Sequence, residues 1–435
     1  MRVNYFAFSF SRGGAAIAAE KFYQLVATKY KVRSYSVERV VSEGDGDRFA
    51  PSFVSFRVHY FLRLLEYALV SLFRKNVEVK HSLNLFSCRL MRNAIRSCSA
   101  SDELVHVHWI NNDSFSVRAL GRLPEHSIIT LHDEWLISGA EHYRDPLTLD
   151  AFDERYTNGG FSLCRSINRW SWGRKYRALS ARNDLIITAP SRWLQGRAAS
   201  SQILGGNTIE LLPNPINTEV FAPLEISERA LSRAELGIRP QDVVFCFGGV
   251  SLDKNRLKGG AELALALDKL SKRLPVEDKK QIVLLVFGGD SGAEEQLGGF
   301  RTLHYGRVAS SEGMRWLYGM SDVTVVPSLV EAFGQVAAES LSCAVPVVCF
   351  NTSGLKDVVD HEVSGFMADF PSISDLSVQL QRAYMLGADE RRSMGHVGRA
   401  NIKARFSFSA VGEIYSRLLE SVHQKKAGTL QNCQK

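Results

Sequence analysis

The chain has 435 residues, of which 45% are hydrophobic and 23% are charged, with a formal net charge of +7 and an isoelectric point near 9.0. A single hydrophobic core rarely extends over a chain of this length, so we expect two domains in a soluble globular protein. No uncharged run of about 18 residues occurs, which excludes a predicted membrane-spanning helix, and the positive charge favours anionic partners: nucleotides, sugar phosphates, an acidic membrane or nucleic acid.

The first half of the chain alternates short apolar segments with helical ones, a pattern typical of a doubly wound parallel sheet. Residues 3–10 are a predicted strand and not a signal peptide, because no small-residue cleavage site follows. Further strands are predicted at 104–109, 127–132 and 185–190, with helices near 15–28 and after the N-cap candidate Ser191. The seven cysteines form no CxxC pair, so we expect reduced thiols in a cytoplasmic protein.

One segment interrupts this alternation, FVSFRVHYFLRLLEYALVSLFRKN at 53–76. Its polar residues recur mostly at helical spacing and leave a wide apolar face, and its charge is net basic. Two interpretations remain open. The helix either lies on an anionic membrane surface, which its dense aromatic and basic residues favour, or is buried in the domain.

The second half repeats the alternation, with strands predicted at 243–250, 282–289, 323–328 and 345–350 and a helix from about 259. The proline-rich segment 211–230 marks the domain boundary. We therefore expect an N-terminal domain at 1–215, a C-terminal domain at 216–405, a helix at 406–423 that returns to the N-terminal domain, and a disordered tail at 424–435.

Two glycine-containing loops between a strand and a helix are candidate phosphate sites. Gly13 and Gly14 would let a ligand approach the backbone at a helix N-terminus, where anions bind well. In the second half, Arg256 and Lys258 precede a glycine pair and would add cations above a helix start. Each loop could instead be a tight turn or a solvated charged loop, and neither has the GxGxxG or P-loop spacing.

Imidazole and indole side chains end two strands of the first half. His108 and Trp109 end one strand, while His132 and Asp133 follow another, at the carboxyl ends where ligands bind in open α/β sheets. Such histidines are more often structural than catalytic. We expect no metal at the histidines of this half, because no carboxylate or cysteine spacing supports one; they are His106, His108, His132 and His142.

The stretch PSLVEAFGQVAAESLSCAVPVV at 327–348 places two carboxylates around a glycine turn. Glu331 lies in the predicted strand-to-helix loop and Glu339 lies within the helix, so both can face one site. Carboxylates accept hydrogen bonds from paired sugar hydroxyls, and free amides after Phe333 and Gly334 suit a phosphate. The alternative is a charged surface helix.

Together these residues resemble family 4 of the retaining glycosyltransferases. The E-x7-E spacing of Glu331 and Glu339 carries the resemblance, with HW at 108–109, HDEW at 132–135, PSRWL at 190–194, LPNPI at 212–216 and KG at 258–259. The HW, HDEW and PSRWL set is most similar to the colanic-acid and O-antigen branch. The resemblance implies the GT-B fold, in which two Rossmann-like doubly wound parallel-sheet domains face a deep cleft and a C-terminal helix crosses back.

The resemblance also implies a role for each candidate residue. Glu339 would hold the nucleotide ribose and Glu331 the transferred sugar, while Arg256 and Lys258 would neutralise the departing diphosphate. The other expected contacts are His132 at the reacting centre, Gly13, Gly14, Phe333, Gly334, Gln335 and Val336 around the donor, and His108, Trp109 and Asp133 on the acceptor side. Leu257 departs from the family pattern, because it separates Arg256 from Lys258.

These implications define the expected function. The protein would transfer a sugar, with retention and without a metal or other cofactor, from a GDP- or UDP-sugar to a glycan acceptor, expected to be lipid-linked, in cell-surface polysaccharide biosynthesis. It would be cytoplasmic and would meet the inner membrane surface through residues 53–76. Two alternatives remain: a nucleotide-sugar epimerase of the same fold, and a basic nucleic-acid-binding protein, which the dispersed charges disfavour.

Overall fold

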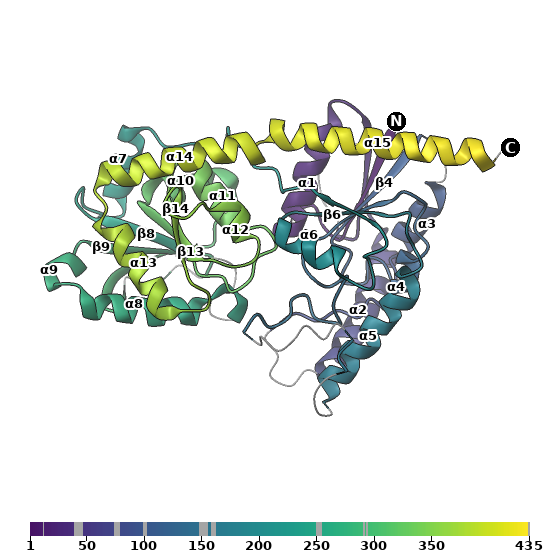
Figure 1. The fold of residues 1–435 in the computed structure, drawn as a ribbon, viewed down its shortest axis with the longest axis horizontal. Coiled ribbons are helices and arrows are strands. Elements are labelled where there is room, and N and C mark those ends of the chain that lie inside the picture. Colours follow the sequence, from purple (N-terminus) through teal and green to yellow (C-terminus); the bar gives the residue numbers. More distant parts are fainter. Residues whose placement is uncertain are drawn as a thin grey trace. The chain divides into compact units, whose positions relative to one another are not determined.

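The computed structural model describes the whole chain except residues 12, 39–46, 74–78, 99–101, 148–154, 158–161, 249–254, 290–291, 293–294 and 434–435. The chain divides into two compact units, which are described separately (Figure 1). The N-terminal unit contains residues 1–215 and 411–435, and the C-terminal unit contains residues 216–410.

The N-terminal unit is built on a seven-stranded sheet in the order β3-β2-β1-β4-β5-β6-β7, in which all neighbours are parallel. Four predicted strands are confirmed, and the polar or short β2, β3 and β7 were not predicted. The strands are β1 Arg2–Ala7, β2 Lys31–Ser36, β3 Arg48–Phe49, β4 Glu103–His108, β5 Ile128–Thr130, β6 Ile186–Ala189 and β7 Thr208–Leu211. The helices are α1 Gly14–Ala27, α2 Phe53–Phe73, α3 Arg89–Ser97, α4 Val117–Leu120, α5 Leu163–Leu179, α6 Arg192–Ala199 and α15 Phe408–Cys433.

The C-terminal unit has the strand order β10-β11-β9-β8-β12-β13-β14, with β10 antiparallel at one edge and the other pairs parallel. The strands are β8 Val243–Gly248, β9 Ile282–Phe287, β10 Glu295–Leu297, β11 Phe300–Gly306, β12 Val323–Val326, β13 Val347–Phe350 and β14 Gly365–Ala368. The helices are α7 Ile226–Glu235, the 3-10 turn η1 Arg256–Lys258, α8 Gly260–Arg273, α9 Val276–Lys279, α10 Ser311–Met320, α11 Gln335–Ser342, α12 Leu355–Val358, α13 Ile373–Met385 and α14 Ala388–Phe406.

Each sheet reverses its strand order once, between β1 and β4 in the N-terminal unit and between β8 and β12 in the C-terminal unit. Chains that leave such neighbouring strands diverge to opposite faces of the sheet, which opens a crevice at the carboxyl ends where ligands bind. Most of the predicted site residues follow these four strands, and His132 and Asp133 follow β5, the neighbour of β4. Topology alone therefore gathers them at two sheet edges.

The C-terminal segment differs from the prediction. The tail expected to be disordered at 424–435 is instead helical as far as Cys433, where α15 ends; residues 434–435 lie outside the described part of the chain. Val411, Tyr415, Leu419 and Val422 recur at helical spacing and are buried in the core of the N-terminal unit. The Tyr415 hydroxyl also lies 2.6 Å from that of Tyr5 on β1. This regular apolar stripe sustains the helix into a sequence that is otherwise polar.

Helix α2 is not the buried helix that was one interpretation of residues 53–76; residues 74–76 lie outside the described part of the chain. Two of its polar side chains face the protein: Glu66 accepts hydrogen bonds from the backbone N–H groups of Leu83 (2.8 Å) and Leu85 (2.9 Å), and His59 is buried. Large apolar side chains face outward: Phe53, Val54, Val58, Tyr60, Phe61, Leu64, Leu65, Tyr67, Leu69 and Leu72. Within the described residues, no helix combines the length and hydrophobicity needed to cross a bilayer.

Candidate functional site

The candidate site of the C-terminal unit is centred on Glu331, in the loop after β12. Its Oε1 accepts a hydrogen bond from the Ser328 hydroxyl (2.8 Å) and lies 2.6 Å from the Lys258 ammonium. Its backbone N–H donates to the Ser353 hydroxyl (2.8 Å). The carboxylate is therefore fixed and partly neutralised, and the Lys258 side chain remains 34% exposed.

Close packing of two loops brings Lys258 to Glu331. Gly259 has φ +70°, and a Cβ atom there would lie 1.8 Å from the Pro327 carbonyl oxygen. The Leu329 N–H donates to the Leu257 carbonyl oxygen (2.9 Å), and the Leu257 side chain is buried. Leu257, which departs from the family pattern, therefore anchors the loop, while Arg256 is exposed beside it.

Glu339 and the turn before α11 form the adjacent part of this site. Glu339 accepts a hydrogen bond from the Gln335 amide (2.6 Å) and from the Tyr318 hydroxyl (3.4 Å). Burial, and then the charge of Glu339, raise the pKa of Tyr318 well above its usual value. Gly334 caps the helix with φ +104°, so the first amides of α11 are presented at the helix start, next to the half-buried Val336.

The Phe333 side chain does not line an open site. It is 2% exposed in the core of the C-terminal unit, where its ring meets that of Phe406 edge-on at a centroid distance of 5.3 Å. Only its backbone is available to a ligand. The aromatic ring therefore anchors the turn that carries Gly334.

The candidate site of the N-terminal unit contains a pair of imidazoles. His108 Nδ1 lies 3.1 Å from His132 Nε2, and the Nε2 atom of His108 is buried without a partner in the described structure. Burial lowers the pKa of His132 to about 4, despite the opposing effect of Asp133. Both rings are therefore neutral at physiological pH, and His132 can act as a hydrogen-bonding group but not as a cation.

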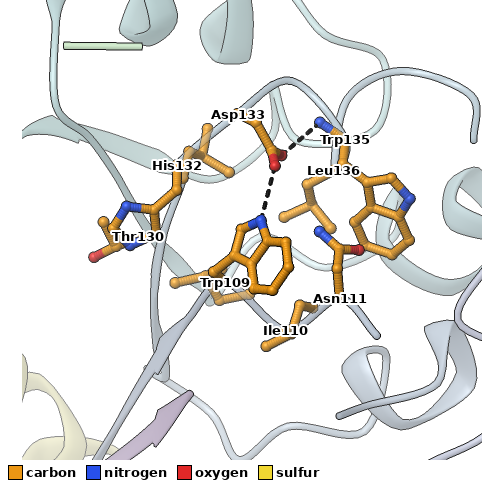
Figure 2. A pocket seen from close by; sticks show the side chains of 10 residues that line it. Trp109, Ile110, Asn111, Thr130, His132, Asp133, Trp135 and Leu136 are labelled. Atoms are coloured by element: carbon orange, nitrogen blue, oxygen red, sulfur yellow. Dashed lines mark hydrogen bonds between the residues drawn. The ribbon is translucent and has the colours of Figure 1, made fainter. Parts of the chain in front are cut away.

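Asp133 organises the segment around this pair. Figure 2 shows its carboxylate directed at the indole of Trp109, which donates from Nε1 (2.9 Å), and at the backbone N–H of Trp135 (3.0 Å). His142 Nδ1 lies 2.6 Å from the same carboxylate. Burial alone would raise the pKa of Asp133, but the His142 interaction and these hydrogen bonds lower it. Trp109 itself has φ +20°, and the hollow beside it, lined also by Ile110, Asn111 and Leu136, has a volume of about 20 Å³.

The other two histidines are engaged elsewhere. His106 contacts the Tyr415 hydroxyl (2.5 Å) and the Thr130 hydroxyl (2.7 Å), and His142 also contacts the Ser82 hydroxyl (2.9 Å). Among the described residues, no group of three histidine, cysteine or carboxylate side chains is arranged to hold a metal. The six cysteines in this part of the chain are free thiols.

Gly13 and Gly14 begin α1 after the carboxyl end of β1, the strand next to β4. Gly13 is exposed with φ +91°, and a Cβ atom at either glycine would meet no other atom within 4 Å. The loop is therefore open, as a phosphate-approach site requires. The space around the two residues would admit a side chain, but the positive φ angle of Gly13 favours glycine.

Sequence reasoning missed several side chains that shape the two sites. Ser353 and Tyr318 approach the carboxylates of the C-terminal unit from distant elements. In the N-terminal unit, Lys80 lies 4.1 Å from the Trp109 ring centroid, and buried Lys175 donates to the carbonyl oxygens of Gly139 (2.5 Å) and Trp135. Burial lowers the pKa of Lys175 to about 7. None of these residues lies in a recognisable motif, so only the fold could reveal them.

Comparison with known proteins agrees with this geometry. Residues 229–400 match the family model described as "Glycosyl transferases group 1". The D-inositol 3-phosphate glycosyltransferase of Corynebacterium jeikeium (strain K411) is 32% identical over 225 residues, 49% of this chain and 52% of that protein. The chain thus spans about half the length of the curated relatives that it matches.

Solved structures match over nearly the whole chain. Sucrose-phosphate synthase from Thermosynechococcus elongatus matches with a TM-score of 0.67 at 16% identity, covering 98% of this chain and 99% of that one. Anabaena HepE in complex with UDP-glucose matches with a TM-score of 0.61 at 17% identity, covering 97% and 100%. These likenesses establish the fold: two Rossmann-like units of the GT-B type, as the sequence predicted.

Proposed function

We propose that this protein is a retaining hexosyltransferase that moves a sugar from a nucleotide diphosphate sugar to a glycan acceptor. The observation that carries the proposal is the Lys258–Glu331 pair at the β8–β12 strand-order reversal, next to the N-terminus of α11. The matched family and the UDP-glucose complex of Anabaena HepE support a UDP-sugar donor. A GDP-sugar remains the other donor class to test.

We propose a task for each group of the donor site. The Lys258 ammonium and the amides at the start of α11 would stabilise the charge that develops on the leaving diphosphate, and Arg256 would add a second cation. Glu331, held by Ser328, would accept hydrogen bonds from the sugar hydroxyls. Glu339, bridged to Gln335, would do the same for the ribose. These groups supply charge stabilisation without a metal, and we propose that none is required.

The proposed retention of configuration at the transferred sugar follows from the hydrogen bonds of the Glu331 carboxylate. Its Oε1 is already occupied by Lys258 and Ser328, which suits sugar binding better than nucleophilic attack. We therefore propose that the acceptor attacks from the face that the diphosphate leaves, and that a phosphate oxygen takes the acceptor proton. In the N-terminal unit, neutral His132 would hydrogen-bond to the sugar, while His108, Trp109 and Asp133 would shape the acceptor side.

The exposed apolar side chains of helix α2 support the proposal that the acceptor lies at a membrane. Surface helices usually turn their polar side outward, but α2 turns His59 and Glu66 inward and exposes Phe61 (60%), Tyr67 (67%) and Leu72 (73%). It packs beside α5 (Figure 1), whose 17 residues include four arginines and one lysine but no acidic residue. An exposed apolar helix next to a basic one fits an anionic bilayer surface. We propose a lipid-linked glycan acceptor for cell-surface polysaccharide synthesis on the cytoplasmic side, where free thiols persist.

A ligand panel tests the donor proposal. Thermal unfolding is followed with UDP-glucose, UDP-galactose, UDP-N-acetylglucosamine, GDP-mannose and GDP-fucose, and binders are then assayed for transfer to lipid-linked glycans and to inositol 3-phosphate, the acceptor class suggested by the names of the relatives. At least one nucleotide sugar should raise the melting temperature of the wild type and should raise that of Lys258→Ala much less. Protection by none, or equal protection of both proteins, would contradict the proposal. Epimerised donor in the absence of acceptor would indicate an epimerase.

A further inference from the structure

We infer that the C-terminal unit has a second binding site, for a small organic phosphate, at the edge of its sheet opposite the candidate donor site. A cavity of about 650 Å³ lies there, between α7, α14 and the segments that lead into β12 and β13. The donor-site residues Lys258 and Glu331 follow the carboxyl ends of the strands. This cavity instead meets Ser321, Asp322 and Pro346, which precede the strands, so it is separate from the donor site.

The cavity has an excess of positive charge. Four arginines line it (Arg229, Arg233, Arg391 and Arg392), with the carboxylates of Asp322 and Glu225. Asp322 is shared, because its two oxygens pair with Arg229 (2.7 Å) and Arg233 (3.0 Å) and also accept the Val244 N–H (2.8 Å). The side chain of Glu225 is engaged in the capping box of α7. Arg392 pairs with Asp389, which does not line the cavity. Arg391 is therefore the lining arginine with the least compensation by negative charge.

Arg391 shows this imbalance most clearly. It is 7% exposed, and its Nε atom is buried without a hydrogen-bond partner. Its Nη1 donates to backbone carbonyl oxygens, including that of Tyr384 (3.0 Å), and in the part of the chain that the structure describes no carboxylate pairs with it. Burial lowers the pKa of Arg391 and of Arg229, as expected for cations held away from water without full compensation.

The shape and walls of the cavity define the ligand class. Guanidinium groups bind phosphate oxygens in pairs, and the N-terminus of α14, a helix of 19 residues, begins at the cavity-lining Ala388. The opposite wall is apolar, with Leu224, Ile238 and Pro240. A ligand with a phosphate at one end and a compact body at the other, such as a sugar monophosphate, satisfies both walls. The volume is within the usual range for a small-molecule site.

Binding measurements with glucose 6-phosphate, inorganic phosphate and glucose test this site. Calorimetric titration of the full chain should show glucose 6-phosphate binding more tightly than inorganic phosphate, and no binding of glucose. Arg392→Glu, at the exposed rim, and Arg391→Met should each weaken binding by at least about tenfold, the usual effect of losing a charged hydrogen bond. Lys403→Glu is the matched control, because it reverses an exposed charge on the same helix without lining the cavity, and it should bind like the wild type.

The outcomes are distinguishable from those for the donor site. Nucleotide sugars should protect Arg392→Glu from thermal unfolding as well as they protect the wild type. The two sites are therefore tested independently, and failure of the donor proposal would not affect this test. The inference is overturned if glucose 6-phosphate does not bind at millimolar concentration. It is equally overturned if Lys403→Glu and Arg392→Glu weaken binding alike, since the ligand would then follow overall charge, or if Lys258→Ala abolishes binding, since the ligand would then occupy the donor site.

Discussion

The ammonium of Lys258 lies 2.6 Å from the carboxylate of Glu331, although the two residues are 73 positions apart in the chain. One follows β8 and the other follows β12, the strands between which the sheet reverses its order. The pair holds a cation beside a carboxylate at this reversal. A diphosphate would then draw Lys258 toward itself and leave Glu331 available to hydroxyl groups.

Replacement of Lys258 by alanine should lower kcat by about 100-fold or more, as expected for loss of one group that stabilises developing charge. Glu331→Gln should mainly raise KM for the donor sugar, because the amide keeps the shape but loses charged hydrogen bonds. Steady-state kinetics with the donor identified by the panel measures both effects. Lys272→Ala removes a solvent-exposed lysine that pairs with Asp268 and should change neither constant. Unchanged kcat in Lys258→Ala would place the chemistry elsewhere.

Gly259→Ala should destabilise the C-terminal unit by several kcal/mol, because the added Cβ would lie 1.8 Å from the Pro327 carbonyl oxygen and the φ angle of +70° disfavours alanine. Thermal unfolding measures this loss. Gly196→Ala in α6 is the control, since its Cβ would meet nothing within 4 Å. It should stabilise the protein by about 0.5–1 kcal/mol through helix propensity. Equal melting temperatures for the two variants would show that the loop contact is wrong.

Phe61→Ser combined with Leu72→Ser should weaken binding to anionic phospholipid vesicles by at least about tenfold, because each change removes a large apolar group from the bilayer contact. Both side chains are exposed, at 60% and 73%, so the melting temperature should stay the same. Vesicle co-sedimentation gives the measurement. Leu231→Ser, which removes a 68% exposed leucine from the C-terminal unit, should bind like the wild type. If the double variant also sediments normally, α2 does not contact lipid.

His106 should make the protein less stable in acid. Burial lowers the pKa of His106 to about 3, whereas the unfolded residue titrates near pH 6.5. Below pH 6.5 the unfolded state therefore binds a proton that the folded state does not bind, so the protein becomes less stable as the pH decreases toward 3. The unfolding equilibrium constant should rise by up to about tenfold per pH unit. Denaturant unfolding of wild type and His106→Gln between pH 7.5 and pH 4 tests this. The variant should gain relative to the wild type as pH falls, and parallel curves would refute a buried neutral imidazole.

Removal of divalent metals should leave sugar transfer unchanged, since Lys258, Arg256 and the start of α11 are proposed to stabilise the leaving diphosphate. Transfer is assayed after dialysis against EDTA and again after addition of Mg²⁺ or Mn²⁺. A drop of about tenfold or more that the metal restores would require a metal-bound diphosphate and a smaller role for the two cations.

Local patterns predicted the elements and the site residues that occupy strand ends. Alternation of apolar segments identified β1, β4, β5 and β6, and Ser191 caps α6 by accepting the Leu194 N–H as expected. The edge strands β3 and β7 escaped notice, because strand propensity is weak where only a few residues pair, and the inner strand β2 escaped notice because its sequence is largely polar. The disordered tail was predicted from its polar composition, but α15 continues into it, and buried Lys426 donates to the Glu103 carbonyl oxygen (2.5 Å).

The sequence by itself determined which candidate site residues the chain carries, because strand ends, glycine turns and the E-x7-E spacing are encoded within a few neighbouring residues. Only the tertiary structure decided which of those residues meet. The Lys258–Glu331 contact requires two loops to pack through Gly259, and Asp133 acquires His142 and Trp109 as partners through a fold that spacing does not report. Periodicity likewise could not show that the apolar side of α2 faces outward, because a helical repeat defines two faces but does not say which one the rest of the protein covers.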